Sequence, residues 1–347
     1  MNLLARGARR FTLLASLLLI TAAPVAVEVA AAQPGTPWLY RGSDVPQDRE
    51  WNFGELRNGV RYAVRKNGVP PGQVSIRIVI DAGSLHETDS ERGYAHLIEH
   101  LSFRESKYLG PAEAIPAWQR LGATFGSDTN AETSPTQTVY KLDLPNATPQ
   151  ALEESFKLLS GMMTAPVLSE HNVRTEVPIV LAEMRERAGA QMRVLDATQA
   201  TFYAGQPLAQ RMPIGTVETL QGASAASVQA FHKRWYRPQN AVVVVVGDAD
   251  PAELTRLVTT YFGGWKVAGK RTPPPSFGDP VAPAGTDPAR PVGETQALVE
   301  PDLPRVVNYG ILRPWRKVND TIVYNQGLMI DSLAQAIINR RLEARAR

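Results

Sequence analysis

The sequence predicts an α+β fold in which a mixed or antiparallel sheet packs with helices. Residues 58–68 and 73–84 alternate apolar and polar side chains between turn signals, so we expect two neighbouring strands there. Residues 149–166 and 169–189 instead repeat their apolar side chains at helical spacing. The two kinds of segment are mixed along the chain without strict alternation, which favours a mixed or antiparallel sheet.

The remaining elements follow from the same patterns. We expect a helix over residues 90–104, with Ser90 as its cap, and a short helix that ends at Gly122. Residues 136–145 alternate as a strand, and the valine run of residues 241–248 predicts a fully buried strand. Pro178 lies inside the helix expected over 169–189, either near its middle or at the start of a new segment.

The composition narrows the classes of partner and of metal site. Charged residues make up 20% of the 347 residues, and the formal net charge is only +3. This balance gives no strong case for nucleic acid or an anionic membrane as a partner. The chain has no cysteine, which excludes disulfides and thiolate ligands. Any zinc ion must therefore be held by histidine and carboxylate side chains.

The first 32 residues differ from the rest. A basic start, "MNLLARGARR", precedes the apolar segment "FTLLASLLLITAAPVAV". This segment is too short, and too much interrupted by proline, for a comfortable membrane span. We expect a signal peptide cleaved after Ala32, the alternative being an uncleaved anchor. The mature chain is then exported, to the periplasm or outside the cell. It is expected to have no membrane span, because no other stretch approaches 18 continuous apolar residues.

A composition break divides the rest of the chain. Residues 271–291 are rich in proline and glycine, which is typical of an extended linker. We expect one domain over residues 45–270 and the start of a second over 292–347, with strand material and then a long helix. Fewer than about 60 residues cannot easily bury a core of their own. The sequence is therefore expected to be the N-terminal part of a longer protein.

The segment "GYAHLIEHLSFR" contains two of the chain's five histidines, four residues apart. On a helix, His96 and His100 lie one turn apart on the same face, so both imidazoles can reach one metal ion. Glu99 can accept a proton from a metal-bound water, and this His-x-x-Glu-His order is the inverse of the common zinc-protease motif. The alternative is an ordinary amphipathic helix with a chance spacing, which is rare in a chain with five histidines.

A hydrolytic zinc site usually needs a third protein ligand and an open position for water. Glu176 and Glu183 are seven residues apart and lie on one face of the helix expected over 169–189. By this reasoning either glutamate can be the third ligand. The alternative is that both belong to a solvated helix face, as glutamates on helices usually do.

Several segments between Trp51 and Trp265 resemble the pitrilysin/insulinase family of zinc metallopeptidases, the inverzincins, which also includes the mitochondrial processing peptidases. "AHLIEHLSF" matches the zinc helix of that family. The resemblance implies that His96 and His100 bind one Zn²⁺ ion and that Glu99 is the general base. It also implies the mixed sheet and packed helices that these peptidase domains share.

The resemblance further divides the roles of the two glutamates. The family's downstream helix carries two glutamates seven residues apart, of which the second ligates zinc and the first supports the site. This implies Glu183 as the third ligand, Glu176 in an auxiliary catalytic role, and a catalytic domain over residues 45–270. Pro178 between the two glutamates departs from the family's pattern and puts this division in question.

The segment "GSDTNAETSPTQTVYKLDLP" is similar to the substrate strand of the same family. By that match, Asn130 and Ala131 hold the main chain of a peptide that adds a strand to the sheet edge. An Asn-Ala pair alone would indicate only a turn. "FHKRWYRPQNAVVVVVGD" resembles the family's segment before a core strand, in which Trp235 and Tyr236 serve packing.

These features predict an exported zinc endopeptidase that hydrolyses peptides or unfolded segments, with a zinc-bound water activated by Glu99. The resemblance implies a second homologous domain or a partner chain that closes a chamber around the peptide. An amidase with the same ligands is the rival enzyme, and the substrate-strand features argue against it. A peptide-binding or scaffold homologue with weak or no catalysis is the non-enzyme alternative. Its usual mark is a broken motif, whereas this motif is whole.

Overall fold

The computed structural model describes residues 38, 42–281, 296–301, 303–308, 310–314, 316 and 318–346. The described residues divide into two units, a larger one within residues 46–314 and a smaller one that combines residues 38 and 42–45 with residues 316 and 318–346. The predicted signal peptide, residues 1–32, lies outside the described residues, so cleavage after Ala32 stays a prediction. The domain limits predicted at residues 45, 270 and 291 also stay predictions.

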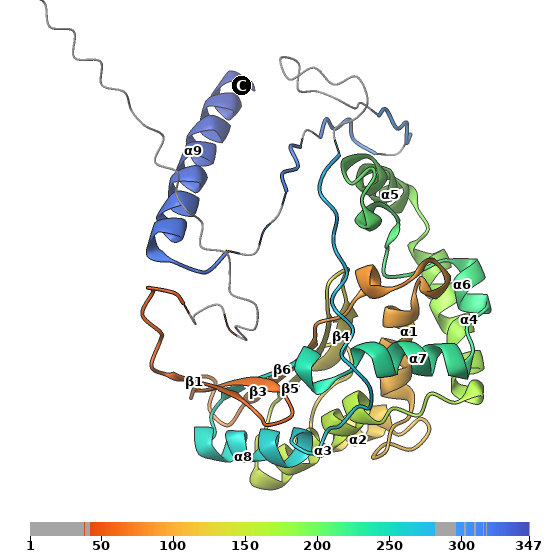
Figure 1. The fold of residues 1–347 in the computed structure, drawn as a ribbon, viewed down its shortest axis with the longest axis vertical. Helices are drawn as coiled ribbons and strands as arrows, with labels where there is room; N and C mark the ends of the chain where they lie inside the picture. Colours follow the sequence, from red (N-terminus) through yellow and green to blue (C-terminus); the bar gives the residue numbers. More distant parts are fainter. Residues whose placement is uncertain are drawn as a thin grey trace, which may run out of the picture. The chain divides into compact units, whose positions relative to one another are not determined.

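The larger unit contains all six strands of the described sheet and eight α-helices (Figure 1). The strands are β1 (Trp51–Glu55), β2 (Arg61–Lys66), β3 (Val74–Ile80), β4 (Thr129–Thr133), β5 (Thr138–Leu144) and β6 (Ala241–Gly247). The helices are α1 (Tyr94–Arg104), α2 (Ala114–Arg120), α3 (Pro149–Thr164), α4 (Glu170–Arg187), α5 (Ala190–Phe202), α6 (Val217–Gln221), α7 (Ala225–Trp235) and α8 (Pro251–Phe262). Short 3₁₀ turns lie at Ser84–His86, Asp89–Glu91, Pro207–Gln210 and Pro238–Asn240.

The strands form a sheet in the order β1-β2-β6-β3-β5-β4. Strands β2 and β6 pair in parallel, and every other neighbouring pair is antiparallel. The predicted α+β class with a mixed sheet is therefore confirmed. The expectation that residues 58–68 and 73–84 form neighbouring strands was wrong, because β6 lies between β2 and β3. Strand order depends on pairing across some 180 residues of chain, which local alternation does not report.

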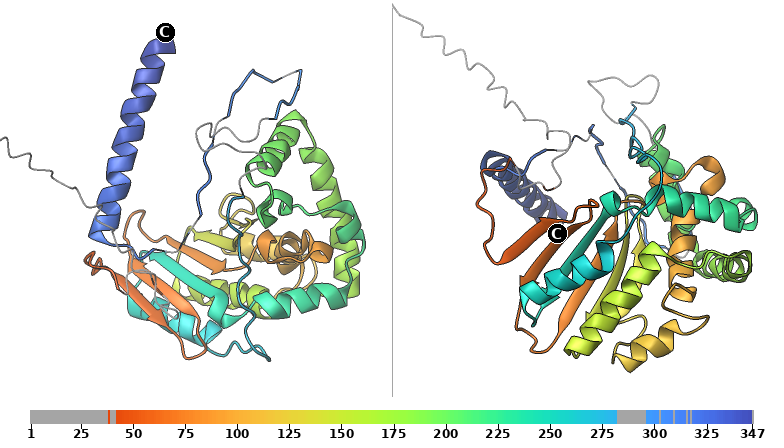
Figure 2. Two further views of the ribbon diagram at one scale, coloured as in Figure 1. Left: turned by 45° about the horizontal axis from the view of Figure 1, so that its top comes forward. Right: turned by 60° about the horizontal axis from the view of Figure 1, so that its bottom comes forward.

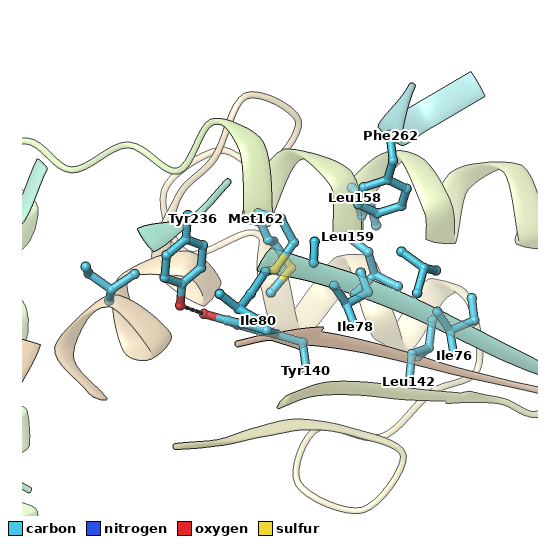
Figure 3. Packing of buried hydrophobic residues seen from close by; sticks show 14 of the residues in the cluster. Ile76, Ile78, Ile80, Tyr140, Leu142, Leu158, Leu159, Met162, Tyr236 and Phe262 are labelled. Carbon is cyan, nitrogen blue, oxygen red and sulfur yellow. Dashed lines mark hydrogen bonds between the residues drawn. The ribbon is translucent and has the colours of Figure 1, made fainter. Parts of the chain in front are cut away.

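One face of the sheet carries the hydrophobic core. Ile76, Ile78 and Ile80 of β3 point into it together with Tyr140 and Leu142 of β5 (Figure 3). Helices α3 and α8 cover this face, and Figure 2 shows them lying along the sheet. The prediction that residues 241–248 form a fully buried strand was wrong in every second position. Buried and half-buried residues alternate along β6, so the opposite face of the sheet is only partly covered.

One glycine and one glutamate determine where helix α1 begins. Gly93 stands at the N-cap with φ +94°, a left-handed conformation that L side chains rarely adopt. The carboxylate of Glu87 accepts hydrogen bonds from the N–H groups of Gly93 (3.0 Å) and Ala95 (2.9 Å). These bonds satisfy N–H groups that lack partners within the helix, and they fix where the His-x-x-Glu-His segment starts.

Helix α4 packs beside α1 and continues through Pro178 without a break. Ser169 caps it by accepting a hydrogen bond from the N–H of Asn172 (3.2 Å). The helix predicted over residues 169–189 is thus one helix, with Pro178 on its exposed side. Proline in a helix interior removes one main-chain hydrogen bond, and an exposed position lets water replace it.

The smaller unit is described mainly by helix α9 (Ile322–Ala346), where the long helix was expected. The main-chain N–H of Ile322 donates to Asp44 Oδ1 at 2.7 Å, and the large apolar side chains of α9 are exposed. The strand material expected before it is not seen, because the described residues between 296 and 314 form no helix or strand. Among the described residues, no helix has both the length and the apolarity of a membrane span.

Candidate metal centre

Three predicted ligands converge between helices α1 and α4. Glu183 Oε2 lies 3.4 Å from His100 Nε2 and 3.7 Å from His96 Nε2. One donor atom from each of these three residues lies within 4.8 Å of the others. The two histidines come from successive turns of α1, as their spacing predicted, whereas Glu183 is brought to them by the packing of α4.

The donor set and its spacing suit zinc. Two ligands on a tetrahedral zinc ion with bonds of about 2.0–2.1 Å are about 3.3 Å apart, close to both His–Glu distances. Two imidazoles and one carboxylate are a donor set of catalytic zinc sites, in which the fourth position takes water. In such sites a metal-binding histidine usually donates a hydrogen bond through its other ring nitrogen. The buried Nδ1 of His96 has no such partner among the described residues.

Glu176 lies behind His100 rather than among the converging donors. Its Oε1 is 3.0 Å from His100 Nδ1, and its Oε2 accepts a hydrogen bond from Arg104 Nη1 at 3.2 Å. Arg104 also donates through Nε to Asn172 Oδ1 at 3.2 Å. With its proton on Nδ1, His100 donates to Glu176 and directs its Nε2 lone pair towards Glu183. The Glu176 carboxylate thereby fixes the tautomer and the ring orientation.

Their surroundings shift the pKa values of the two histidines in opposite directions. Burial, with smaller effects from His100 and Arg187, lowers the pKa of His96 to about 3, so this imidazole is neutral at physiological pH. Burial also lowers the pKa of His100. The hydrogen bond to Glu176 and the nearby glutamate charges outweigh that effect, so the pKa of His100 is raised overall. The raised pKa means that protons compete with a metal ion for His100 more strongly than for an ordinary imidazole.

Glu99 is buried on the side of α1 that packs against the sheet edge. Only 7% of it is exposed, and burial raises the pKa of its carboxyl group although a hydrogen bond from Thr133 opposes the rise. Thr133 Oγ1 donates to Glu99 Oε2 at 2.5 Å. A carboxylate with a raised pKa takes up a proton more readily, which is the property that a general base needs.

The predicted substrate residues lie on the edge strand of the sheet. Asn130 and Ala131 belong to β4, which pairs with β5 on one side and ends the strand order on the other. Asn130 Oδ1 accepts a hydrogen bond from the main-chain N–H of Ala131 at 3.0 Å. The structure therefore places this pair in a strand rather than in a turn. One residue separates Ala131 from Thr133, the residue of β4 that contacts Glu99.

Sequence reasoning missed three residues that contact the predicted site. Arg187 Nη2 is 2.5 Å from Glu183 Oε1, and its i,i+4 spacing on one helix is a signal that could have revealed it. Arg104 and Thr133 gave no such signal. Their partners lie 72 and 34 residues away in the sequence, so only the fold shows these contacts.

Comparison with known proteins supports the resemblance seen in the motifs. The family model described as insulinase (peptidase family M16) matches residues 62–213, and the model described as the peptidase M16 inactive domain matches residues 222–306. The boundary between the two matches does not divide the sheet, because β6 from the second lies between β2 and β3. A protein named probable zinc protease PqqL, from Haemophilus influenzae, is 37% identical over 220 residues, which are 63% of this chain.

Solved structures agree with these sequence matches. The first half of the periplasmic protease PqqL from Escherichia coli is 32% identical with a TM-score of 0.62, covering 67% of this chain and 50% of that one. Pitrilysin, at 22% identity and a TM-score of 0.58 over 69% of this chain and 25% of that one, shares the fold. The chain spans only 24% of the length of its Haemophilus relative. By its two matched domains and its fold, the chain belongs to the insulinase/pitrilysin family of peptidases, peptidase family M16.

Proposed function

We propose that this chain is the zinc-binding part of an exported metalloendopeptidase that hydrolyses peptides or unfolded protein segments. The observation that carries the proposal is the convergence of His96, His100 and Glu183, with donor spacings close to those around a tetrahedral zinc ion. The names of its relatives, which include probable zinc proteases, support the same reading.

These three side chains would hold a zinc ion, which would supply a water of lowered pKa and polarise the scissile carbonyl. Glu99 has the environment of the general base. It accepts the proton of the attacking water and then delivers it to the leaving nitrogen, so that one carboxyl group serves both steps. Glu176 keeps His100 in the correct tautomer and orientation, which makes it a positioning residue rather than a group that touches the substrate.

The peptide is bound through the edge strand β4. An extended peptide that adds to this edge forms main-chain hydrogen bonds with β4, a mode that reads backbone more than side chains. The main chain of Ala131 and the side chain of Asn130, which accepts a hydrogen bond from the N–H of Ala131, are then the contacts nearest the middle of the strand. Unfolded segments are favoured as substrates, because a strand within a folded protein has its own main-chain groups already paired.

Further parts of the proposal concern the rest of the protein and its location. The structural relative from Escherichia coli is described as the first half of a periplasmic protease. By analogy, a second homologous domain or a partner chain closes a chamber over the edge strand of this chain. The N-terminal residues 1–32 are proposed to direct export to the periplasm.

Hydrolysis of a quenched, unstructured peptide by the zinc-loaded protein tests the function, with zinc content measured in parallel. We expect cleavage that a chelator stops, and we expect Glu99→Gln to keep its zinc while losing nearly all activity, by about 10²-fold or more. Glu186→Gln is the matched control, because Glu186 is an exposed glutamate on the same helix as Glu183.

The possible outcomes separate the components of the proposal. Failure to bind zinc would refute the metal centre. Zinc binding without cleavage, both by this chain and by the full-length protein, would instead favour the peptide-binding or scaffold alternative. Cleavage only by the full-length protein would show that the second half completes the site.

A further inference from the structure

Thr133 connects the edge of the sheet with Glu99. It is the last residue of β4, and its hydroxyl donates a hydrogen bond to Glu99 Oε2 at 2.5 Å. Thr133 pairs with Thr138, and Ala131 pairs with the fully buried Tyr140, so Thr133 and Ala131 share the face of the sheet on which α1 packs. The hydroxyl of Thr133 thus reaches α1 from the strand that ends the sheet.

The main chain of Thr133 faces the open edge of the sheet. The carbonyl of Asp128 accepts a hydrogen bond from the main-chain N–H of Asp143, a residue of β5, at 2.7 Å. The carbonyl of the next residue, Thr129, accepts one from Gly126, on the other side, at 2.8 Å. Because antiparallel pairing alternates along a strand, residues 131 and 133 face outwards like residue 129. Thr133 therefore offers its N–H and C=O groups to an added strand while its side chain contacts Glu99.

We propose that Thr133 couples the binding of a peptide strand to the positioning of the catalytic base. A peptide that pairs with the main chain of Thr133 orders that residue. Because threonine is restricted at χ1, an ordered main chain fixes the direction of its hydroxyl. The hydroxyl then fixes the Glu99 carboxylate through a hydrogen bond to a charged acceptor, which is among the stronger kinds. Thr133 is a positioning residue in this account, and the inference rests on the proposed function.

Two substitutions at Thr133 and one on the same face of the strand isolate this hydrogen bond. Thr133→Val removes the donor but keeps the shape and the strand preference of the residue. Thr133→Ser restores the donor. Thr129→Val makes the same change at a residue whose buried hydroxyl has no hydrogen-bond partner among the described residues, Glu99 included. A general effect of Thr-to-Val changes in β4 would appear in both valine variants.

Steady-state hydrolysis of an unstructured peptide by the full-length, zinc-loaded protein is the first measurement. We expect Thr133→Val to lower kcat by about 10- to 100-fold, the effect of losing one hydrogen bond to a charged group. KM and zinc content should stay unchanged, since the main chain that binds the peptide is intact. Thr133→Ser should recover most of kcat, and Thr129→Val should resemble the wild type.

A second measurement needs neither metal nor turnover. In the zinc-free protein with ¹³C-labelled glutamate carboxyl groups, the signal of Glu99 is identified by its loss in Glu99→Gln. Adding the same peptide should shift this signal in the wild type and in Thr133→Ser, but not in Thr133→Val. Peptide binding is followed in the same samples, so that a missing shift is assigned to lost coupling only where the peptide binds.

Several results would overturn the coupling. These are an unchanged kcat in Thr133→Val, a loss that appears in KM alone, an equal loss in Thr129→Val, and no peptide-induced shift in the wild type. If the peptide is cleaved normally by Thr133→Val, the proposed peptidase function stands and only the coupling fails. If the wild type neither binds zinc nor cleaves, the peptidase proposal fails, and the carboxyl signal still decides whether strand addition reaches Glu99.

Discussion

The two halves of helix α4 are held in different ways, and each carries one acidic residue of the candidate site. The first half buries five residues against the rest of the protein: Asn172, Val173, Glu176, Val177 and Val180. Residues 181–187 include no buried residue, although Leu181 and Met184 pack partly against the core. Pro178 lies near the transition between the two halves.

The side chains of the two glutamates are therefore held in place by different contacts. Glu176 is fixed by contacts of the fold, with His100 and Arg104 on its two carboxylate oxygens. Glu183 has the two imidazole nitrogens and Arg187 as its polar neighbours, and the Arg187 side chain is 59% exposed. Ion pairs between exposed side chains contribute little to the stability of the arrangement they join. If the proposed zinc site is correct, we expect the fold to position Glu176 in advance and a bound metal ion to complete the position of Glu183.

The largest effect is expected when the two glutamates are exchanged for glutamine. Glu183→Gln should weaken zinc binding by more than about 100-fold because it removes a charged ligand, whereas Glu176→Gln should weaken it by about 10- to 100-fold as a partner of a ligand does. Zinc affinity measured by competition with a chelator checks both values. Glu186→Gln on the same helix should bind zinc like the wild type. Equal losses for Glu176 and Glu183 would contradict the division of roles.

Metal removal should affect the second half of α4 more than the first. With zinc at about 100 times its dissociation constant, opening that breaks the site costs about 2.7 kcal/mol more, which is about a 100-fold slower exchange of amide hydrogens. We expect this protection over residues 181–187 and little change over residues 172–177, whose contacts exist without metal. Hydrogen exchange with and without a chelator measures it. Uniform protection along the helix would show that both halves are equally preorganised.

Truncation of a buried side chain should show where the packed half of α4 ends. Val180→Ala removes two methyl groups at a fully buried position and should lower the free energy of unfolding by roughly 2 kcal/mol, from lost burial and a small cavity. Ile179→Ala changes a neighbour that is 47% exposed and should cost under about 1 kcal/mol. Denaturant unfolding of the zinc-free variants gives both values. Similar costs at the two positions would remove the packing boundary that the comparison rests on.

The residues of the candidate site were predictable where a local rule connects them. His96, Glu99 and His100 lie within five residues of one helix, so helical periodicity alone fixes their mutual placement. The spacing of Glu176 and Glu183 predicted a shared helix face in the same way. It could not divide their roles, because the side chains that hold Glu176 come from α1, across a helix interface.

Features that depend on the order of distant segments were not predictable from patterns. The valine run of β6 indicates a strand, but not that it separates β2 from β3 or that one of its faces is half exposed. Five consecutive valines carry no alternation from which the two faces could be distinguished. The contact of Thr133 with Glu99 has the same origin, since it requires both the position of β4 at the sheet edge and the packing of α1 against it.

The smallest expected effect concerns Pro178, the departure from the family's pattern that lies between the two glutamates. Pro178→Ala restores a main-chain N–H and a better helix former at an exposed position, and it also loosens the unfolded chain. We expect a net stabilisation of about 1 kcal/mol, well below the full cost of about 3 kcal/mol for proline in a helix, because the native helix already tolerates it. Thermal unfolding without zinc measures this gain.

If the proline directs the second half of α4, the same variant should bind zinc more weakly despite its higher stability, since Glu183 would leave its place near His96 and His100. Unchanged zinc affinity would show that the bound metal alone determines the position of Glu183.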